Sequence, residues 1–191
     1  MSLKLIVVLL ALPPFLAGCG PEDVAEAPPP APLTRDATGY YCNMTVVDHA
    51  GPKAQIHLAG KTAPIWFSSV RDAVAFTKLP GEPKNIAAIY VQDAGKITDW
   101  KHPGDGAWID AKSAYFVIGS AMKGGMGQPE TVPFATAAAA RAFAAKHGGD
   151  VVAWPDIPTG YVIVDTPDPE RSAHPPSGGH RHGNDHEHEG S

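Results

Sequence analysis

Apolar and polar residues alternate in short runs along the middle of the chain, and two stretches have helical spacing instead. Alternation over four to eight residues is typical of strands, whereas apolar residues three or four positions apart are typical of a helix. The pattern predicts strands over residues 54–58, 63–67, 86–91, 107–110, 115–119, 151–154 and 161–164. It predicts helices over residues 69–77 and 134–146, the second ending at His147-Gly148-Gly149.

An aromatic repeat relates the two halves of this region. Phe67 and Phe76 are nine residues apart, Phe134 and Phe143 are also nine apart, and the second pair follows the first at an offset of 67 residues. We infer a duplication in which each half contributes strand, strand, helix and strand. The expected fold class is α+β, with two repeated ββαβ units whose small antiparallel sheets pack on helices.

The ends of the chain have a different composition. Residues 1–18 contain Lys4 and an apolar run of about 12 residues, too short to span a bilayer, and resemble a lipoprotein signal peptide ending before a lipidated Cys19. Proline and acidic residues in 19–38 predict a tether of roughly 40 to 50 Å. Residues 39–104 and 105–166 would be the two units. Residues 167–191 lack large apolar side chains and are expected to be disordered.

Lipidation would place the protein outside the cytoplasm, held to a membrane by its anchor. Gly20 follows the lipidated cysteine, where an Asp would favour retention in the inner membrane. We therefore expect a periplasmic protein anchored in the outer membrane. The formal net charge of −5 disfavours nucleic acid as a partner.

The chain has two cysteines, and lipidation of Cys19 leaves Cys42 without a disulfide partner. A lone thiol in an exported protein is a candidate reactive group or soft-metal ligand. Met44 follows two residues later, and in an extended segment both side chains would point to the same face. The alternative is that Cys42 and Met44 are buried packing residues.

Met122 and Met126 lie in the loop G-S-A-M-K-G-G-M-G, where the four glycines predict accessible thioethers. Thiolate and thioether together are the donors that Cu(I) prefers. The alternative for this loop is that its methionines cover an apolar patch. His49 could be a third ligand, or could only form a local hydrogen bond.

Two further observations limit the function. The tail carries imidazoles that could bind divalent metals loosely or could simply be solvated, namely His174, His180, His182, His186 and His188. The chain has no H-E-x-x-H, G-x-S-x-G or P-loop motif, and Cys42 has no C-x-x-C partner. We therefore expect no enzyme activity.

Taken together, these motifs resemble the NosL family of lipoproteins. The resemblance lies in the run ending at Cys19 and in the segments Y-C-N-M-T-V-V-D-H-A-G-P-K-A-Q-I, W-F-S-S-V-R-D-A and Y-F-V-I-G-S-A-M-K-G-G-M-G. It implies a copper chaperone that delivers Cu(I) for the copper–sulfide centre of nitrous oxide reductase. The implied partners are the apo-reductase and an ABC-type membrane complex of its maturation machinery. The implied fold is two ββαβ units, similar to part of organomercurial lyase.

The resemblance also implies which residues bind the metal. The copper cysteine of the family corresponds to Cys42, and its loop methionine corresponds most naturally to Met126, with Met44 and Met122 as the next choices. Many relatives have a proline in the loop where this chain has G-G-M-G. The competing expectation is a lipid-anchored docking partner of the membrane complex whose sulfur atoms are only structural.

Overall fold

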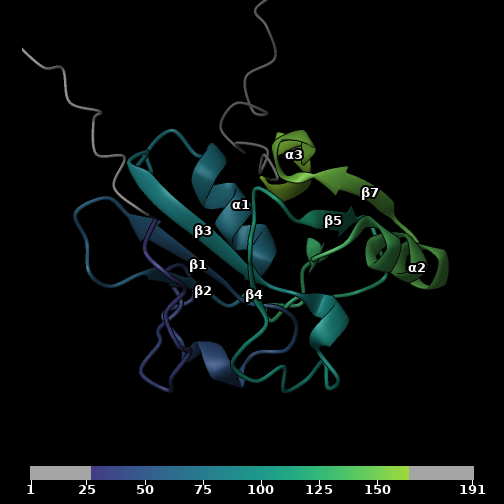
Figure 1. The fold of residues 1–191 in the computed structure, drawn as a ribbon, viewed down its shortest axis with the longest axis horizontal. Coiled ribbons are helices and arrows are strands. Elements are labelled where there is room, and N and C mark those ends of the chain that lie inside the picture. Colours follow the sequence, from purple (N-terminus) through teal and green to yellow (C-terminus); the bar gives the residue numbers. More distant parts are fainter. Residues whose placement is uncertain (1–26, 164–191) are drawn as a thin grey trace, which may run out of the picture.

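The computed structural model describes residues 27–163, which form two antiparallel sheets with helices packed against them (Figure 1). The first sheet has the order β2-β1-β3-β4, with β1 Ala54–Leu58, β2 Ile65–Phe67, β3 Ile86–Gln92 and β4 Trp108–Asp110. The second has the order β6-β5-β7, with β5 Tyr115–Ile118, β6 Val132–Phe134 and β7 Asp150–Ala153. The expected α+β class with two small antiparallel sheets is confirmed.

A hydroxyl residue precedes each of the two longer helices. Helix α1 spans Val70–Lys78 after Ser69, and α2 spans Ala137–His147 after Thr136, whose hydroxyl accepts a hydrogen bond from the N–H of Ala139. Gly148, with φ of 75°, caps the end of α2. The remaining helices are short, namely α3 Thr159–Val162 and the 3-10 helices η1 Val46–Asp48, η2 Ala94–Lys96 and η3 Trp154–Asp156.

The two halves have the same order of elements, β1-β2-α1-β3 and β5-β6-α2-β7, and in each sheet the first strand lies between the other two. The repeated phenylalanines occupy matching places. Phe67 ends β2 and its ring centroid lies 5.5 Å from that of Phe76 in α1, whereas Phe134 ends β6 and lies 5.0 Å from Phe143 in α2. Each pair therefore joins a strand end to the following helix.

Three details of the prediction are wrong. The strand predicted over 107–110 as part of the second unit is β4, which instead extends the first sheet by pairing with the long strand β3. The second strand of the second unit is β6, which was not predicted, and only its last residue, Phe134, fell within the predicted helix. The strand predicted over 161–164 is absent, because residues 159–162 form α3.

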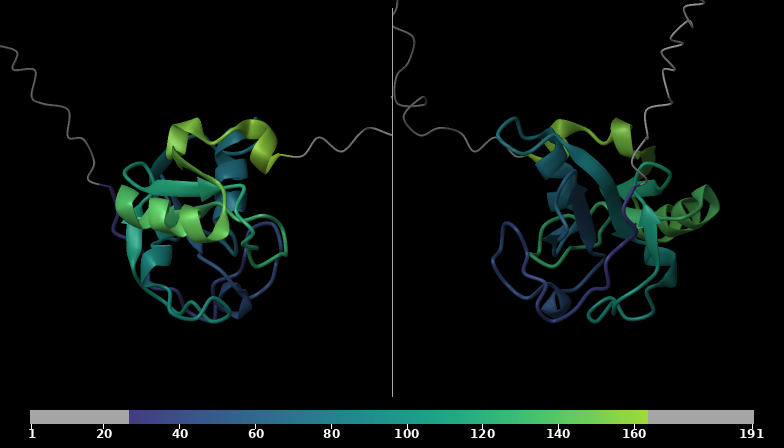
Figure 2. Two further views of the ribbon diagram at one scale, coloured as in Figure 1. Left: turned by 90° about the vertical axis from the view of Figure 1, so that its right-hand side faces the viewer. Right: turned by 60° about the vertical axis from the view of Figure 1, so that its left-hand side comes forward.

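Two hydrophobic clusters share β5 between them. Phe116 faces the larger cluster, which β1, β2, β3 and α1 build with side chains such as Ile56, Phe67 and Val74. Its neighbour Val117 points to the opposite face and packs with Val132, Phe134 and Ala140 of β6 and α2. The second sheet therefore lies between the larger cluster and α2. Helix α2 forms one side of the molecule (Figures 1 and 2).

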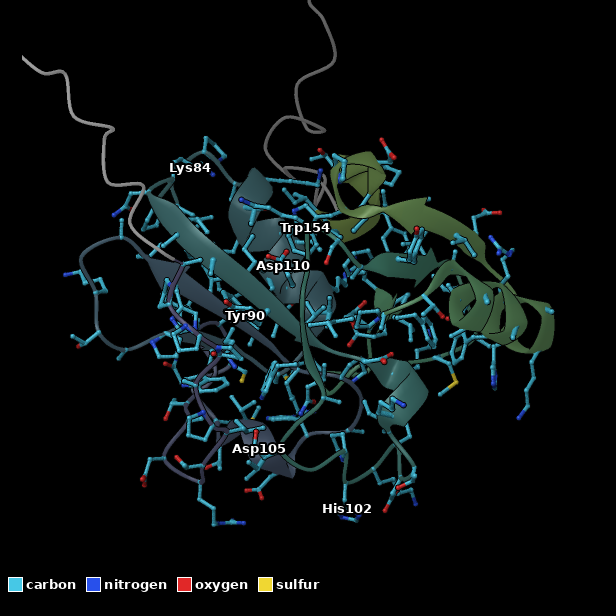
Figure 3. The ribbon with its side chains drawn as sticks, viewed as in Figure 1. Lys84, Tyr90, His102, Asp105, Asp110 and Trp154 are labelled. Atoms are coloured by element: carbon cyan, nitrogen blue, oxygen red, sulfur yellow. The ribbon has the colours of Figure 1, made fainter. Side chains whose placement is uncertain are left out.

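The other face of the first sheet is covered by residues 28–37, which we call the strap. Gln55 on β1 exchanges two hydrogen bonds with the backbone of Ala31, of 2.7 and 3.0 Å. The Tyr90 hydroxyl donates to the carbonyl of Pro28 at 2.7 Å, and Asp105 accepts from the N–H of Leu33 at 2.9 Å. Figure 3 shows Tyr90 beside β3 and Asp105 nearer the lower end of the molecule, so the strap runs between these two places.

The strap corrects the expected boundary of the tether. Residues 19–38 were predicted to be a separate extended segment, but Leu33 and Ala37 are buried in a third cluster with Val46, against Trp66 and Trp108. The domain therefore begins at about residue 28. Residues 1–26, with the expected signal peptide and Cys19, and the histidines after residue 163 lie outside the described residues. Within residues 27–163, no helix is long and apolar enough to cross a membrane.

Candidate metal site

Cys42 and Met44 lie in a closed turn that spans residues 39–44. An isolated bridge pairs Thr38 with Thr45, and inside it the N–H of Gly39 donates to the carbonyl of Met44 at 2.9 Å. The N–H of Asn43 donates back to the carbonyl of Gly39 at 2.8 Å, with Asn43 in the left-handed region at φ of 53°. The expectation of an extended Cys-x-Met segment is therefore wrong, because the chain folds back on itself at Asn43.

Gly39 leaves room for the thiol of Cys42. A Cβ atom there would lie 2.5 Å from the Sγ atom of Cys42, closer than any real contact of a Cβ atom. The backbone of the next residue attaches the turn to the first sheet, because the N–H of Tyr40 donates to the carbonyl of Trp66 at 2.8 Å. The thiol is thus folded over the backbone of Gly39 at the edge of β2.

The thiol faces the junction between β2 and α1. The Sγ atom of Cys42, which is half-buried, lies 3.6 Å from the hydroxyl oxygen of the buried Ser68. Beside it, the hydroxyls of Tyr40 and Tyr41 donate to the two oxygens of the Glu82 carboxylate at 3.0 and 2.9 Å. The contact with Ser68 thus places the sulfur at the end of β2.

The methionine loop ends in a small hairpin, residues 123–129, which we call the Met126 hairpin. An isolated bridge pairs Lys123 with Pro129, and the N–H of Gly124 donates to the carbonyl of Gln128 at 2.9 Å. The N–H of Gly127 donates to the carbonyl of Gly124 at 2.9 Å, which makes Met126 part of the tip. The side chain of Met126 is 45% exposed.

The Met126 hairpin packs against the segment that follows Cys42. A Cβ atom at Gly125 would lie 2.6 Å from the Cβ of His49 and 3.0 Å from the carbonyl oxygen of Ser68. The same Ser68 contacts Cys42 through its hydroxyl, so it joins the thiol to the residue that precedes Met126. Both views of Figure 2 show the loop before β6 beside the segment coloured purple to blue that holds Cys42 and His49.

His49 presents a free ring nitrogen at this junction. Its Nδ1 atom lies 3.3 Å from the carbonyl oxygen of Gly125, whereas its Nε2 atom is buried and has no hydrogen-bond partner. A buried nitrogen without a partner is costly unless a ligand occupies it. The sequence suggested that His49 either forms a local hydrogen bond or binds a metal. The Nδ1 atom forms the local hydrogen bond, and the Nε2 atom remains available to bind a metal.

Lys53 holds the loop that carries His49. Its side chain is fully buried, and the Nζ atom donates to the carbonyls of His49 at 2.6 Å, Ala50 at 3.0 Å and Gly51. Burial lowers the pKa of Lys53 to about 8, so at neutral pH the group is still a cation that satisfies three carbonyls. Lys53 thus shapes the turn locally, and its full burial depends on the fold.

Glu130 lies beneath the Met126 hairpin. One of its oxygens accepts hydrogen bonds from the hydroxyl of Ser69 at 3.1 Å and from the N–H groups of Arg71 and Thr131 at 3.0 and 2.8 Å. The other oxygen is buried without a partner and lies against Gly124. Burial raises the pKa of Glu130 to about 7. This carboxyl thus joins the start of α1 to the hairpin, and sequence patterning did not reveal it.

The four candidate sulfur ligands differ in their surroundings. Met44 and Met126 are exposed at 44% and 45%, and Cys42 is half-buried beside Ser68. Met122 instead packs against the second hydrophobic cluster, which is the alternative role considered for the loop. Within residues 27–163, no three His, Cys, Asp or Glu side chains gather closely enough to hold a metal ion. The contact of Cys42 with a polar side chain is with the hydroxyl of Ser68, whose carbonyl lies against Gly125 beside Met126.

Comparison with known proteins identifies relatives of this chain. The model of the NosL family matches residues 30–162. The copper-binding lipoprotein NosL of Achromobacter cycloclastes is 44% identical over 165 residues, which cover 86% of each chain. The copper-binding lipoprotein NosL of Stutzerimonas stutzeri is 35% identical over 154 residues, covering 80% of this chain and 78% of the relative.

The fold has a counterpart among solved structures. The crystal structure of the copper chaperone NosL from Shewanella denitrificans superposes with a TM-score of 0.61 at 25% sequence identity, covering 69% of this chain and 96% of that one. The matched family region includes the turn of Cys42, the loop of His49 and the Met126 hairpin. The chain belongs to the NosL family.

Proposed function

We propose that this protein is a chaperone that carries Cu(I) on the sulfur of Cys42 and on methionine thioethers. The observation that carries the proposal is the position of Ser68. Its hydroxyl lies 3.6 Å from the thiol, and its carbonyl lies against Gly125, the neighbour of Met126. The relatives named as copper-binding lipoproteins and as a copper chaperone support copper as the cargo.

The donor set suits monovalent copper. Cys42 supplies an anionic thiolate, and the exposed Met126 supplies a neutral thioether, which are soft ligands of the kind that Cu(I) prefers. His49 contributes the Nε2 atom that has no partner. Met44 is the next thioether along the turn, whereas Met122 has its side chain in the second hydrophobic cluster and serves packing.

The exposure of the thioethers suits transfer. A metal held by one thiolate and one or two weak thioethers keeps a coordination position open to an incoming ligand. Copper then passes through a shared-ligand intermediate, with the exposed methionines leaving first. The protein acts as a carrier and catalyses no reaction, in agreement with relatives that are named as copper-binding proteins and a chaperone.

The proposed wider setting is the one expected from the sequence. The chain is a periplasmic protein anchored through Cys19, in the outer membrane, and does not bind nucleic acid. It passes Cu(I) to apo-nitrous oxide reductase for the copper–sulfide centre, together with the ABC-type membrane complex of the maturation machinery. The relatives named as copper-binding lipoproteins support the membrane anchor.

Complementation separates this function from that of a docking partner without metal transfer. In a denitrifying strain that lacks this protein, the parent chain is expected to restore the copper content and activity of nitrous oxide reductase, whereas Cys42→Ser is not. Ser68→Ala, which keeps the sulfur, is expected to restore most of both. Full restoration by Cys42→Ser would show that the thiol is not needed. The protein would then act as a docking partner and not as a copper carrier.

The copper ligands are tested by X-ray absorption on the chain loaded with Cu(I). The expected spectrum has two or three sulfur neighbours at the metal and one nitrogen from His49. The variant His49→Ala is expected to lose the nitrogen and keep the sulfur neighbours. A spectrum with only nitrogen and oxygen neighbours would contradict the site, because it would place copper on other side chains.

A further inference from the structure

Trp100 lies between the two loops from which the proposed copper site takes its ligands. Its indole Nε1–H donates to the carbonyl of Lys123 at 3.0 Å, at the base of the Met126 hairpin. Its own backbone carbonyl accepts from the N–H of Gly51 at 2.7 Å, in the loop of His49. One residue is thus hydrogen-bonded to both loops.

The ring of Trp100 fits closely against the first of these loops. A Cβ atom at Gly51 would lie 3.3 Å from the Cζ2 atom of the indole, and the φ of 76° at Gly51 also favours glycine. The ring packs at the edge of the second hydrophobic cluster, as the side chain of Met122 does. Packing of the ring orients the Nε1–H group toward Lys123.

The bond to Lys123 acts at the base of a hairpin with a glycine-rich tip. The Lys123–Pro129 bridge and the bond from Gly124 to Gln128 close the base, while Gly125 and Gly127 flank Met126. Flanking glycines leave the tip many conformations, and ordering it on metal binding costs entropy. Holding the base reduces that cost before the metal arrives.

We propose that Trp100 is a positioning residue that holds the Met126 hairpin against the loop of His49, so that the thioether of Met126 is placed for copper in the free protein. The inference rests on the proposed function, since it assigns Met126 to the metal. It adds that the affinity depends on a hydrogen bond from a side chain that does not touch the metal. Trp100→Phe removes the donor and keeps an aromatic ring in the cluster.

The test uses the full chain with Cys19→Ser, which prevents lipidation, and its variants Trp100→Phe, Met126→Leu and the double mutant. Affinity for Cu(I) is measured anaerobically by competition with a chelator, and the melting temperature is measured beside it. The matched control is Trp108→Phe, since the Nε1–H of Trp108 also makes a single bond, to Asp105 at 3.1 Å, but lies by the strap.

Trp100→Phe is expected to weaken Cu(I) binding about three- to tenfold, the effect of one hydrogen bond. It is expected to have no further effect in the Met126→Leu background, and Trp108→Phe is expected to leave the affinity unchanged. An unchanged affinity in Trp100→Phe, or an equal loss with and without Met126, would overturn the inference. Weak binding by the parent itself would instead refute the proposed function.

Hydrogen exchange tests the positioning without copper. The N–H groups of Gly124 and Gly127 are bonded within the hairpin, so their exchange reports its order. In the free protein, Trp100→Phe is expected to speed exchange at both amides, and Trp108→Phe is not. Exchange that is unchanged in Trp100→Phe would overturn the inference whatever the copper affinity.

Discussion

The Sγ atom of Cys42 and the hydroxyl oxygen of Ser68 lie 3.6 Å apart, although 26 residues separate them in the sequence. This contact brings the turn of residues 39–44 to the start of α1, where the carbonyl of Ser68 also meets Gly125. The thiol is therefore held at a junction of three segments. Changes in the surroundings of the thiol should affect copper binding more than they affect folding.

Gly39→Ala should displace the thiol. The new Cβ atom would lie 2.5 Å from Sγ, so Cys42 must rotate away from Ser68, and Cu(I) affinity should fall at least tenfold. The measurement is chelator competition on both proteins. Gly81→Ala is the matched control, because a Cβ atom at that position meets nothing within 4 Å. Equal affinity in the parent and Gly39→Ala would mean that the position of the thiol in the turn is irrelevant to the metal.

Met122 and Met126 should respond differently to the same substitution. Met126→Leu removes an exposed thioether and should weaken Cu(I) binding without changing the melting temperature. Met122→Leu exchanges packing residues of similar volume, so the affinity should stay constant and the free energy of unfolding should change by less than about 1.5 kcal/mol. The opposite pattern would place the ligand at Met122.

Glu130 should make stability depend on pH. Burial raises its folded pKa to about 7 from the ordinary value of 4.5, so the folded protein retains a proton that the unfolded chain loses between those pH values. The contribution of Glu130 to the free energy of unfolding should therefore be largest below pH 4.5. It should fall by about 3 kcal/mol as the pH rises to 7 and then level off. Denaturant titrations across this range measure the fall.

Glu130→Gln is the control for that dependence. The amide oxygen can still accept from Ser69, Arg71 and Thr131, but the side chain cannot titrate. Between pH 4.5 and 7, the free energy of unfolding of the parent should fall by about 3 kcal/mol more than that of the variant. The same slope in both proteins would assign the dependence to other groups.

Gln55→Ala should release the strap from the first sheet. The change removes both hydrogen bonds to Ala31 and leaves His57 without its partner at 2.8 Å, so a loss of about 2 to 3 kcal/mol is expected. Limited proteolysis should then cleave near residue 31 faster in the variant than in the parent. Copper affinity should not change, because the lost contacts of Gln55 with Ala31 involve neither Cys42 nor the Met126 hairpin. Protection of residue 31 in the variant would contradict the account of the strap.

The strap also shortens the reach from the expected lipid anchor. Nine peptide links separate Cys19 from Pro28, and a chain of that length spans at most about 30 Å when fully extended. This is less than the roughly 40 to 50 Å expected from the composition of residues 19–38. The domain is therefore held close to the lipid surface in the proposed setting.

Local patterns predicted most helices and strands, whereas contacts between distant residues determine how the strands pair. Strand β1 spans residues 54–58 as the alternation predicts, and α2 ends before Gly148 as its glycines predict. The three residues of β6 contain Pro133 and are too few to show a period of two. Strand β4 joins the first sheet because β3 has a side free for pairing. The sequence of residues 108–110 does not indicate this partner.

The sequence predicts candidate ligands for the site but not its geometry. Residue type singles out Cys42 and Met126 as candidates, because soft donors are rare and recognisable. The turn at Asn43 and the contact with Ser68 depend on partners far away in the chain. Lys53 and Glu130 resemble ordinary surface residues in the sequence, and only the fold buries them. The strap was missed for the same reason, since its partners are side chains of the sheet.

The most direct test of the central claim is the stoichiometry of tight Cu(I) binding in the full chain and in its Cys42→Ser variant, both with Cys19→Ser. Anaerobic titration against a chelator should show one tight equivalent in the parent that is absent from the variant, while both keep the same melting temperature. Any binding by the histidines after residue 163 would be common to both proteins. A tight equivalent that persists without the thiol would contradict the assignment of copper to Cys42.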